Sequence, residues 1–179
     1  MAKDLKDLQV GDHIVRFGVV HRITKVEMVP NADGEEDKIV HFEPVYKNRR
    51  NETLRLSIPI KNMSDTTIRL PENITAIRNE LKFLREGEYE PTPFNRIKVR
   101  KIINTNQLRD VTQVLKTMWE EKRDKDKNFT ISKRNTFLMV MRRFQQEVAH
   151  VLDISLEEAE EMITSALDTG WKRKSKSTA

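Results

Sequence analysis

A change in hydrophobic period near residue 70 is the feature that most constrains how this chain folds. Between residues 13 and 60 apolar and polar positions alternate, as at Leu54, Leu56 and Ile58, and the apolar residues are often β-branched. Period two is typical of β-strands. From residue 74 onward apolar residues recur every three or four positions, which is the period of an amphipathic helix. The chain therefore predicts an α+β fold, with a β-rich N-terminal part and an α-helical C-terminal part.

The β-rich part has short strands separated by turns rich in Asn, Asp and Gly. Several short strands joined by hairpins favour a small closed or nearly closed barrel, because closure removes exposed sheet edges. Turns are expected at residues 30–37 and 47–52. Strands are expected at residues 13–29 (interrupted at Gly18), 37–46 and 52–60.

The helical part contains five amphipathic segments with short connections, which predicts a compact bundle. The first ends at Gly87, the fourth has Ser132 as its expected N-cap, and the fifth opens with Ser155 and Glu158 in the spacing of a capping box. The first helix is expected to carry Ile74 and to end at Gly87, and the others are expected at about residues 94–104, 106–123, 132–152 and 155–170. The resulting division is a barrel at 1–70, a helical domain at 71–170 and a basic disordered tail at 171–179.

Composition excludes several classes of protein. The 179 residues carry a net charge of +5 and no cysteine, so disulfides, thiol nucleophiles and cysteine zinc sites are ruled out. The sequence contains no run of about 18 apolar residues, so it predicts no membrane-spanning helix. The N-terminus has no apolar segment of the kind found in secretory signals. These features predict a soluble cytoplasmic protein.

Candidate catalytic residues are few. None of the four histidines is spaced from another histidine or a carboxylate as metal ligands usually are. Five glycines form neither a Walker loop nor a dinucleotide-binding pattern. The carboxylates at 157–161 lie in the first turn of a predicted helix, where negative charge suits the helix dipole. We therefore expect no enzyme activity, no metal and no cofactor.

The segment "PTPFNRIKVRKI" at residues 91–102 places a phenylalanine before a basic helix. Local basic clusters favour polyanionic partners, although a solvated helix face has the same composition. Phe94 permits two interpretations. It is either a hydrophobic staple packed inward at the start of the helix, or an exposed ring that contacts a ligand.

The strand that ends in "SIPI" at residues 57–60 also permits two interpretations. Proline cannot donate to a β-ladder, so this strand either ends the barrel and leads into the linker, or forms an edge that pairs with a strand of another protein.

The order of these parts resembles the CarD/CdnL family of bacterial transcription regulators. The similarity is carried by "VGD-IV" at the start, "SIPI", "ITAIRNELKFLREG", the aromatic before "NRIKVRKI", and "IS" opening a long helix. The resemblance implies a Tudor-like, SH3-like barrel that binds the β subunit of RNA polymerase. It also implies a helical domain that contacts promoter DNA near the upstream edge of the melted region, where a tryptophan of the family wedges into the minor groove. No cofactor is implied.

The resemblance also implies the site residues. Phe94 takes the place of the tryptophan and lacks its indole N–H. The family's "YP-x-HG" is shortened here to "RFGVV", and Ser57 stands where some members carry an arginine. The implied DNA-binding residues are Phe94, Asn95, Arg96, Lys98, Arg100, Lys101 and Arg134. The implied polymerase-binding residues are Arg55, Ser57 and Pro59.

We therefore expect a transcription regulator that stabilises the promoter open complex and associates with the nucleoid through RNA polymerase. Two alternatives remain open from the residues. One is a nucleic-acid-binding protein that acts without polymerase. The other is a protein–protein adaptor whose basic face is only solvated.

Overall fold

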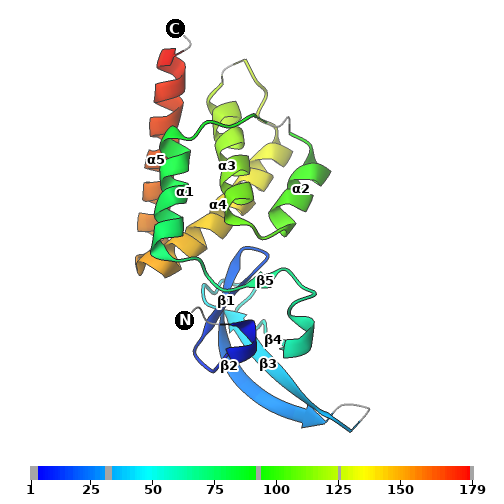
Figure 1. Cartoon of the computed structure of the whole chain (residues 1–179). Helices are drawn as coiled ribbons and strands as arrows, with labels where there is room; N and C mark the ends of the chain where they lie inside the picture. Colours follow the sequence, from blue (N-terminus) through cyan, green and yellow to red (C-terminus); the bar gives the residue numbers. More distant parts are fainter. Residues whose placement is uncertain (1–3, 31–33, 92–93, 125, 178–179) are drawn as a thin grey trace. The chain divides into compact units, whose positions relative to one another are not determined.

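The computed structural model describes residues 4–30, 34–91, 94–124 and 126–177. The chain divides into two compact units, Met1–Pro71 and Glu72–Ala179. The first is built of strands and the second of helices (Figure 1), so the predicted α+β class is confirmed.

The first unit is a curled five-strand antiparallel sheet that forms a half-barrel. Its strand order is β4-β3-β2-β1-β5, and all neighbouring strands are antiparallel. The concave side is filled by apolar side chains, which are Leu8, Ile14, Ile23, Val40, Phe42, Met63 and Ile68. The strands are β1 (His13–Arg16), β2 (Val19–Pro30), β3 (Glu36–Pro44), β4 (Leu56–Pro59) and β5 (Ile68–Arg69).

The sequence predicts a closed or nearly closed barrel, and the observed sheet is a half-barrel. Within the described residues β4 and β5 are the two ends of the strand order and are not hydrogen-bonded to each other. β4 has only four residues and ends at Pro59, which has no N–H to donate, and β5 has only two residues. Strands this short cannot form the ladder that closure requires.

The β1–β2 hairpin turns tightly at Phe17 and Gly18. Both residues have positive φ, 50° and 72°. A two-residue hairpin turn of this kind suits Asn-Gly, because asparagine tolerates the left-handed region better than bulky residues do and glycine has no Cβ. The Phe17 ring is exposed, and the Arg16 guanidinium lies 5.2 Å from its centroid.

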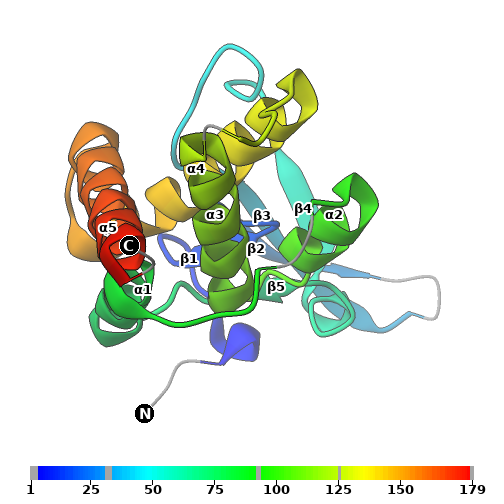
Figure 2. The same cartoon turned by 90° about the horizontal axis from the view of Figure 1, so that it is seen from above.

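The second unit is a bundle of five described helices. The helix α3 lies between the α1–α5 pair and α2 in both views (Figures 1 and 2), and it packs against the other four helices. The helices are α1 (Ile74–Glu86), α2 (Arg96–Asn104), α3 (Leu108–Arg123), α4 (Ile131–Leu152) and α5 (Leu156–Ser177). Fully buried side chains of this unit include Ile77, Leu84, Ile103, Leu115, Met118, Phe144 and Ile163.

The helix caps follow the sequence in one case and differ in another. Before α5, Ser155 and Glu158 form the predicted capping box, with N···O distances of 2.8 and 3.1 Å. The predicted Ser132 cap of α4 is wrong. Thr130 has the extended backbone of a cap and accepts from the Lys133 N–H at 3.3 Å, so Ser132 already lies inside the first turn.

The C-terminal end of α5 also differs from the prediction. The helix was expected to stop near Gly170 and to be followed by a disordered tail at 171–179, but it continues through Ser177. Gly170 is buried against α1, where a Cβ would lie 2.3 Å from the carbonyl oxygen of Leu84. The glycine therefore allows two helices to approach closely and does not end the helix.

Candidate nucleic-acid interface

The basic helix α2 begins two residues later than predicted. Asn95 has an extended backbone, and its side-chain oxygen accepts from the Lys98 N–H at 3.0 Å, so Asn95 is the N-cap. This bond satisfies one of the free N–H groups of the first turn. Asn95, which the resemblance implies as a DNA contact, thus already uses its side-chain oxygen to start the helix.

The buried and charged faces of α2 are distinct. Val99 and Ile103 are buried, with 6% and 1% of their surface exposed. At about 100° per residue, Arg96 and Arg100 lie on one flank of the buried face formed by Val99 and Ile103. Lys98 lies on the other flank of that face. The four predicted cations are all exposed and make no ion pair with any described residue; they are Arg96, Lys98, Arg100 and Lys101.

Phe94 is half-buried and does not project freely. Together with Val99 and residues of α3 such as Val114 and Met118, it lines a groove of about 120 Å³. Phe94 precedes the cap and Val99 follows it by four positions, which is the arrangement of a hydrophobic staple. The staple interpretation therefore has direct geometric support, and part of the ring stays accessible.

Positive charge from α4 also lies beside this ring. The Lys133 Nζ is 5.7 Å from the ring centroid of Phe94. The same ammonium forms an ion pair with Glu121 at 2.7 Å. Phe94 and Lys133 line a second groove, together with Glu120, Glu121 and Lys174. The ring thus lies where α2, α3 and the first turn of α4 meet.

Arg134 is exposed, but helix geometry places it away from α2. Gln145, which lies on nearly the same side of α4, donates to the Leu156 carbonyl at 2.7 Å and so marks the side that faces α5. Arg143 follows Arg134 by nine positions and therefore points about half a turn away. Arg143 is half-buried, and burial, followed by the positive charge of Arg100 on α2, lowers its pKa. Lys133 and Arg143 were not predicted as site residues, although both lie at a different angle around α4 from Arg134, which could have distinguished them from it.

The residues implied as polymerase contacts lie at or next to the edge strand β4. Arg55 precedes the strand and forms an ion pair with Glu43 at 3.0 Å. Ser57 is exposed and pairs in register with His41, while Pro59 is half-buried at the end of the strand. The Arg55 guanidinium is thus already held within the half-barrel.

Glu43 gathers three cations, which are Arg22, Lys47 and Arg55, at 3.5, 3.1 and 3.0 Å. The hydrogen bond from Lys47, together with the charges of Arg55 and Arg22, lowers the pKa of the Glu43 carboxyl. The three cations thereby lose part of their attraction for an external anion.

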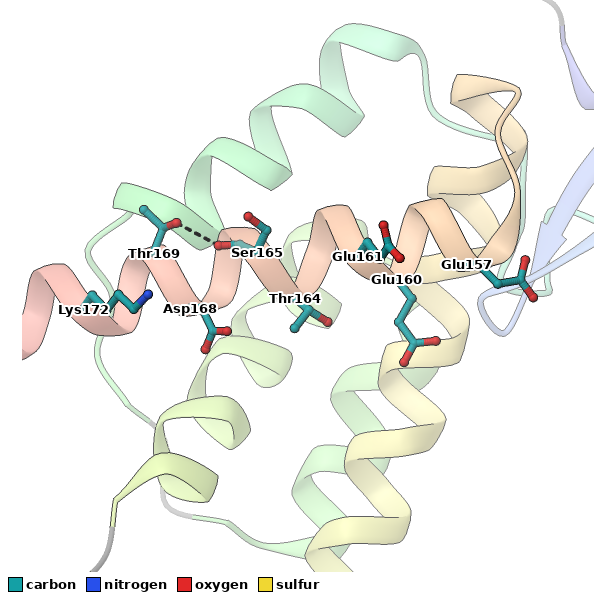
Figure 3. A pocket seen from close by; sticks show the side chains of 8 residues that line it. All are labelled: Glu157, Glu160, Glu161, Thr164, Ser165, Asp168, Thr169 and Lys172. Carbon is teal, nitrogen blue, oxygen red and sulfur yellow. Dashed lines mark hydrogen bonds between the residues drawn. The ribbon is translucent and has the colours of Figure 1, made fainter.

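A third groove, of about 610 Å³, runs along the exposed face of α5 (Figure 3). Its charged lining is almost entirely acidic, and one cation lies near its end. Carboxylates repel phosphates, so this face is unsuited to nucleic acid. The lining residues are Glu157, Glu160, Glu161, Thr164, Ser165, Asp168, Thr169 and Lys172.

Neither protein-family models nor curated proteins match this chain. Across the described ranges, no helix is long and apolar enough to cross a membrane. No group of three or more His, Asp or Glu side chains in the same ranges is arranged to hold a metal ion.

Proposed function

We propose that this protein is a transcription regulator that binds the β subunit of RNA polymerase and stabilises the promoter open complex. In this proposal the half-barrel is the Tudor-like polymerase-binding domain, and the helical unit contacts the minor groove near the upstream edge of the melted DNA. The observation that carries the proposal is the start of α2, where a partly accessible aromatic ring precedes four exposed cations that have no anionic partner among the described residues.

The energetics of such a contact are favourable. Apolar side chains inserted at a distorted base step unstack it at a cost of a few kcal/mol, and cations that contact phosphates offset that cost. Phe94 is half-buried and lines the same groove as Val99, so less conformational freedom would be lost on binding DNA than for a fully exposed ring. The effect on promoter opening equals the difference in affinity for melted and paired DNA.

The edge strand β4 of the half-barrel supports the proposed contact with the polymerase β subunit. β4 ends the strand order, and an extended segment of a partner can add to such an edge through main-chain hydrogen bonds. Ser57 is exposed in this strand and Arg55 lies directly before it, so both can take part in side-chain recognition. The proposed site of action is the cytoplasm, at the nucleoid.

The first test is co-purification of RNA polymerase with the tagged chain from native extract, followed by binding to the isolated β subunit. Retention of the β subunit supports the proposal. Binding to promoter DNA without any retention of polymerase supports the alternative of a polymerase-independent nucleic-acid-binding protein, and overturns the division of roles between the two units.

The second test separates DNA contact by Phe94 from its staple role. Phe94→Ala and Val99→Ala both remove apolar volume from the same groove, but only Phe94 has an accessible ring. We expect Phe94→Ala to shorten the lifetime of the open complex more than Val99→Ala does. The comparison is corrected for the unfolding free energy that each variant loses. Equal effects on the lifetime would leave Phe94 as a staple only. If Phe94→Ala and Arg96→Glu both leave promoter opening unchanged while partner binding persists, the adaptor alternative holds.

A further inference from the structure

The groove between α2 and α3 has room for one planar ring. Its volume is about 120 Å³, which is close to the ~150 Å³ of an engineered cavity in another protein that binds benzene. Phe94 and Ile102 are half-buried, so part of the apolar wall is accessible from outside. The groove thus has the size and the lining for a flat uncharged ring. Its apolar residues are Phe94, Val99, Ile102, Val114 and Met118.

One stripe of α3 forms the floor of this groove and carries its polar groups. The lining residues of α3 run from Asp110 to Glu121 at spacings of three and four residues, so they lie on the same side of the helix. A carboxylate lies at each end of the stripe, and Gln113 lies between them. All three side chains are half-buried and therefore accessible. A ring in the groove thus meets a carboxylate at whichever end its edge faces.

The two carboxylates retain capacity to accept hydrogen bonds. The Thr105 hydroxyl donates to the Asp110 Oδ2 at 2.9 Å, and the Lys133 ammonium pairs with the Glu121 Oε2 at 2.7 Å. Each interaction engages one oxygen, whereas an ionised carboxylate has about four acceptor positions. The side-chain amide of Gln113 forms no hydrogen bond within the described residues and adds a further acceptor. These groups can accept from N–H donors of a ligand, and the carboxylates repel phosphates.

Lys98 supplies the opposite charge beside the groove. It precedes Ile102 by four positions, so helix geometry places both side chains on the same side of α2. Lys98 is exposed and forms no ion pair with any described residue. The site therefore combines a place for an uncharged ring that has N–H donors with an adjacent cation for an anionic group. A nucleotide has the same two parts, a base and a phosphate.

We propose that this groove binds one unpaired nucleobase of the melted DNA that carries an exocyclic amino group, while Lys98 contacts its phosphate. The proposal rests on the proposed function, which brings melted DNA to α2, and names what the site recognises. A base removed from its stack is commonly received by aromatic and apolar side chains and read along its Watson–Crick edge. The amino groups of cytosine, adenine and guanine can donate to a carboxylate, whereas thymine presents carbonyl oxygens. The acidic ends of the groove therefore favour bases that have an amino group.

The first experiment compares the affinity of the full chain for single strands of deoxycytidine and of deoxyuridine, at neutral pH and several salt concentrations. The two bases have the same ring size, but cytosine has an amino group where uracil has a carbonyl oxygen. We expect the wild type to bind the deoxycytidine strand about 3- to 10-fold more tightly. Asp110→Asn combined with Glu121→Gln should abolish this preference. Equal affinities in the wild type, or a preference unchanged in the double variant, would overturn the proposal.

The matched control is Glu157→Gln combined with Glu161→Gln, because it removes the same number of charges from the exposed face of α5. A change in net charge acts on both strands alike, so this control should keep the preference for deoxycytidine. Lys98→Gln should weaken binding of both strands equally. It should also reduce the salt slope by about 0.7, as the loss of one phosphate contact on a single strand predicts.

Gln113→Phe tests the groove without a change of charge. The new ring fills the groove from a half-buried position, so the preference for deoxycytidine should be lost while the salt slope stays that of the wild type. Thermal melting of each variant serves as the folding control. A folded Gln113→Phe variant that keeps the full preference would show that the base binds elsewhere, and would overturn the proposal even if the carboxylate variants fail to fold.

The outcomes separate this proposal from the proposed function. If the polymerase β subunit is retained and Phe94→Ala shortens the lifetime of the open complex, while the two strands bind equally, the proposed function stands and the base site falls. If the strands are distinguished as expected but polymerase is not retained, the base site stands and the proposed function falls.

Two other occupants of the groove would each overturn the proposal. If Gln113→Phe lowers retention of polymerase without changing the binding of either strand, the groove takes a segment of the polymerase. A last arm uses deoxycytidine monophosphate at constant ionic strength. Should it raise the melting temperature of the wild type but not of Gln113→Phe, while the strands are not distinguished, the groove takes a free nucleotide.

Discussion

Gly170 of α5 faces the carbonyl oxygen of Leu84 in α1, and a Cβ added to the glycine would lie 2.3 Å from that oxygen. Glycine inside a helix normally costs about 1 kcal/mol relative to alanine, so Gly→Ala usually stabilises. Here we expect Gly170→Ala to destabilise by about 1–3 kcal/mol, because the backbone of α1 must move. The measurement is thermal or urea unfolding. Thr169→Ala, on the exposed face of the same turn, is the control and should be neutral or slightly stabilising; a more stable Gly170→Ala would contradict the close packing.

The carboxylate of Glu80 joins α1 to α3. It is 7% exposed, and it accepts from the Thr112 hydroxyl at 2.6 Å and from the Arg109 Nε at 3.0 Å. Glu80→Gln cannot accept from both partners through two oxygens, so we expect a loss of about 1–3 kcal/mol in unfolding free energy. Glu86→Gln, at an exposed position of the same helix, should cost less than about 0.5 kcal/mol. Equal losses for the two variants would show that this network adds no stability.

Acid should destabilise the half-barrel through His21. This side chain is buried beneath the sheet, its Nδ1 lies 2.8 Å from the Val19 carbonyl oxygen, and its ring packs edge-on against Phe42. Burial, aided by the charge of Arg16, lowers the pKa of His21 below its ordinary value, although the Val19 bond acts in the opposite direction. The unfolded chain therefore binds a proton at a higher pH than the folded chain does.

This difference sets the direction of the pH effect. The stabilising effect of His21 is fully present above the unfolded pKa of about 6.5 and declines as pH falls from there toward the folded pKa. An NMR titration of the His21 ring protons should give a midpoint below 6.5, and urea unfolding should show lower stability at pH 5.5 than at pH 7.5. A midpoint at or above 6.5 would remove His21 as the source.

Substitution of Phe17 should stabilise the hairpin. Its φ of 50° is tolerated by asparagine and strained for a bulky residue, so Phe17→Asn should raise stability by about 0.5–1 kcal/mol despite the loss of the Arg16 contact. Phe17→Ala removes the ring but keeps a strained side chain, and should give no gain. The melting temperatures of the two variants show whether the strain at residue 17 outweighs the contact with Arg16. A less stable Phe17→Asn would mean that the Arg16–Phe17 contact outweighs the strain.

The edge strand β4 offers a test of the polymerase contact in the full chain. Ser57 is exposed, so Ser57→Glu should leave the melting temperature within about 1 °C of the wild type, as surface changes usually do. Under the proposed function it should weaken retention of the polymerase β subunit about tenfold. Thr53→Glu introduces the same charge in the loop before the strand and serves as the control. Retention unaffected by either substitution would move the contact away from β4.

The fold was largely predictable because its signals are local. Hydrophobic period identified all five helices and the four strands β1 to β4, and the Ser155 capping box marked the start of α5. The end of α5 was missed because Gly170 is explained by its contact with Leu84, which is a tertiary contact that no local pattern reveals. The two-residue β5 was missed because it is too short to show a period.

The site was predictable in composition but not in arrangement. The four cations of α2 are exposed, as a basic helix with a narrow apolar stripe suggests. Burial of Phe94 depends on the groove between α2 and α3, and the distance between Lys133 and Phe94 depends on how α4 packs. Both are set by packing between helices, so the sequence could not decide between the staple and the exposed ring.

The helix α5, which carries the acidic groove, and the helix α2, which carries the basic cluster, lie on opposite sides of α3 (Figures 1 and 2). The helical unit is therefore electrically polarised, and a polyanion at a distance exerts a torque on it before any atoms touch. Neutralising Glu157, Glu160 and Glu161 should then lower the fraction of encounters with nucleic acid that have the productive orientation, while leaving dissociation of the bound complex nearly unchanged. Such a separation of charge would orient α2 toward the nucleic acid before contact, although the net charge of the chain is small.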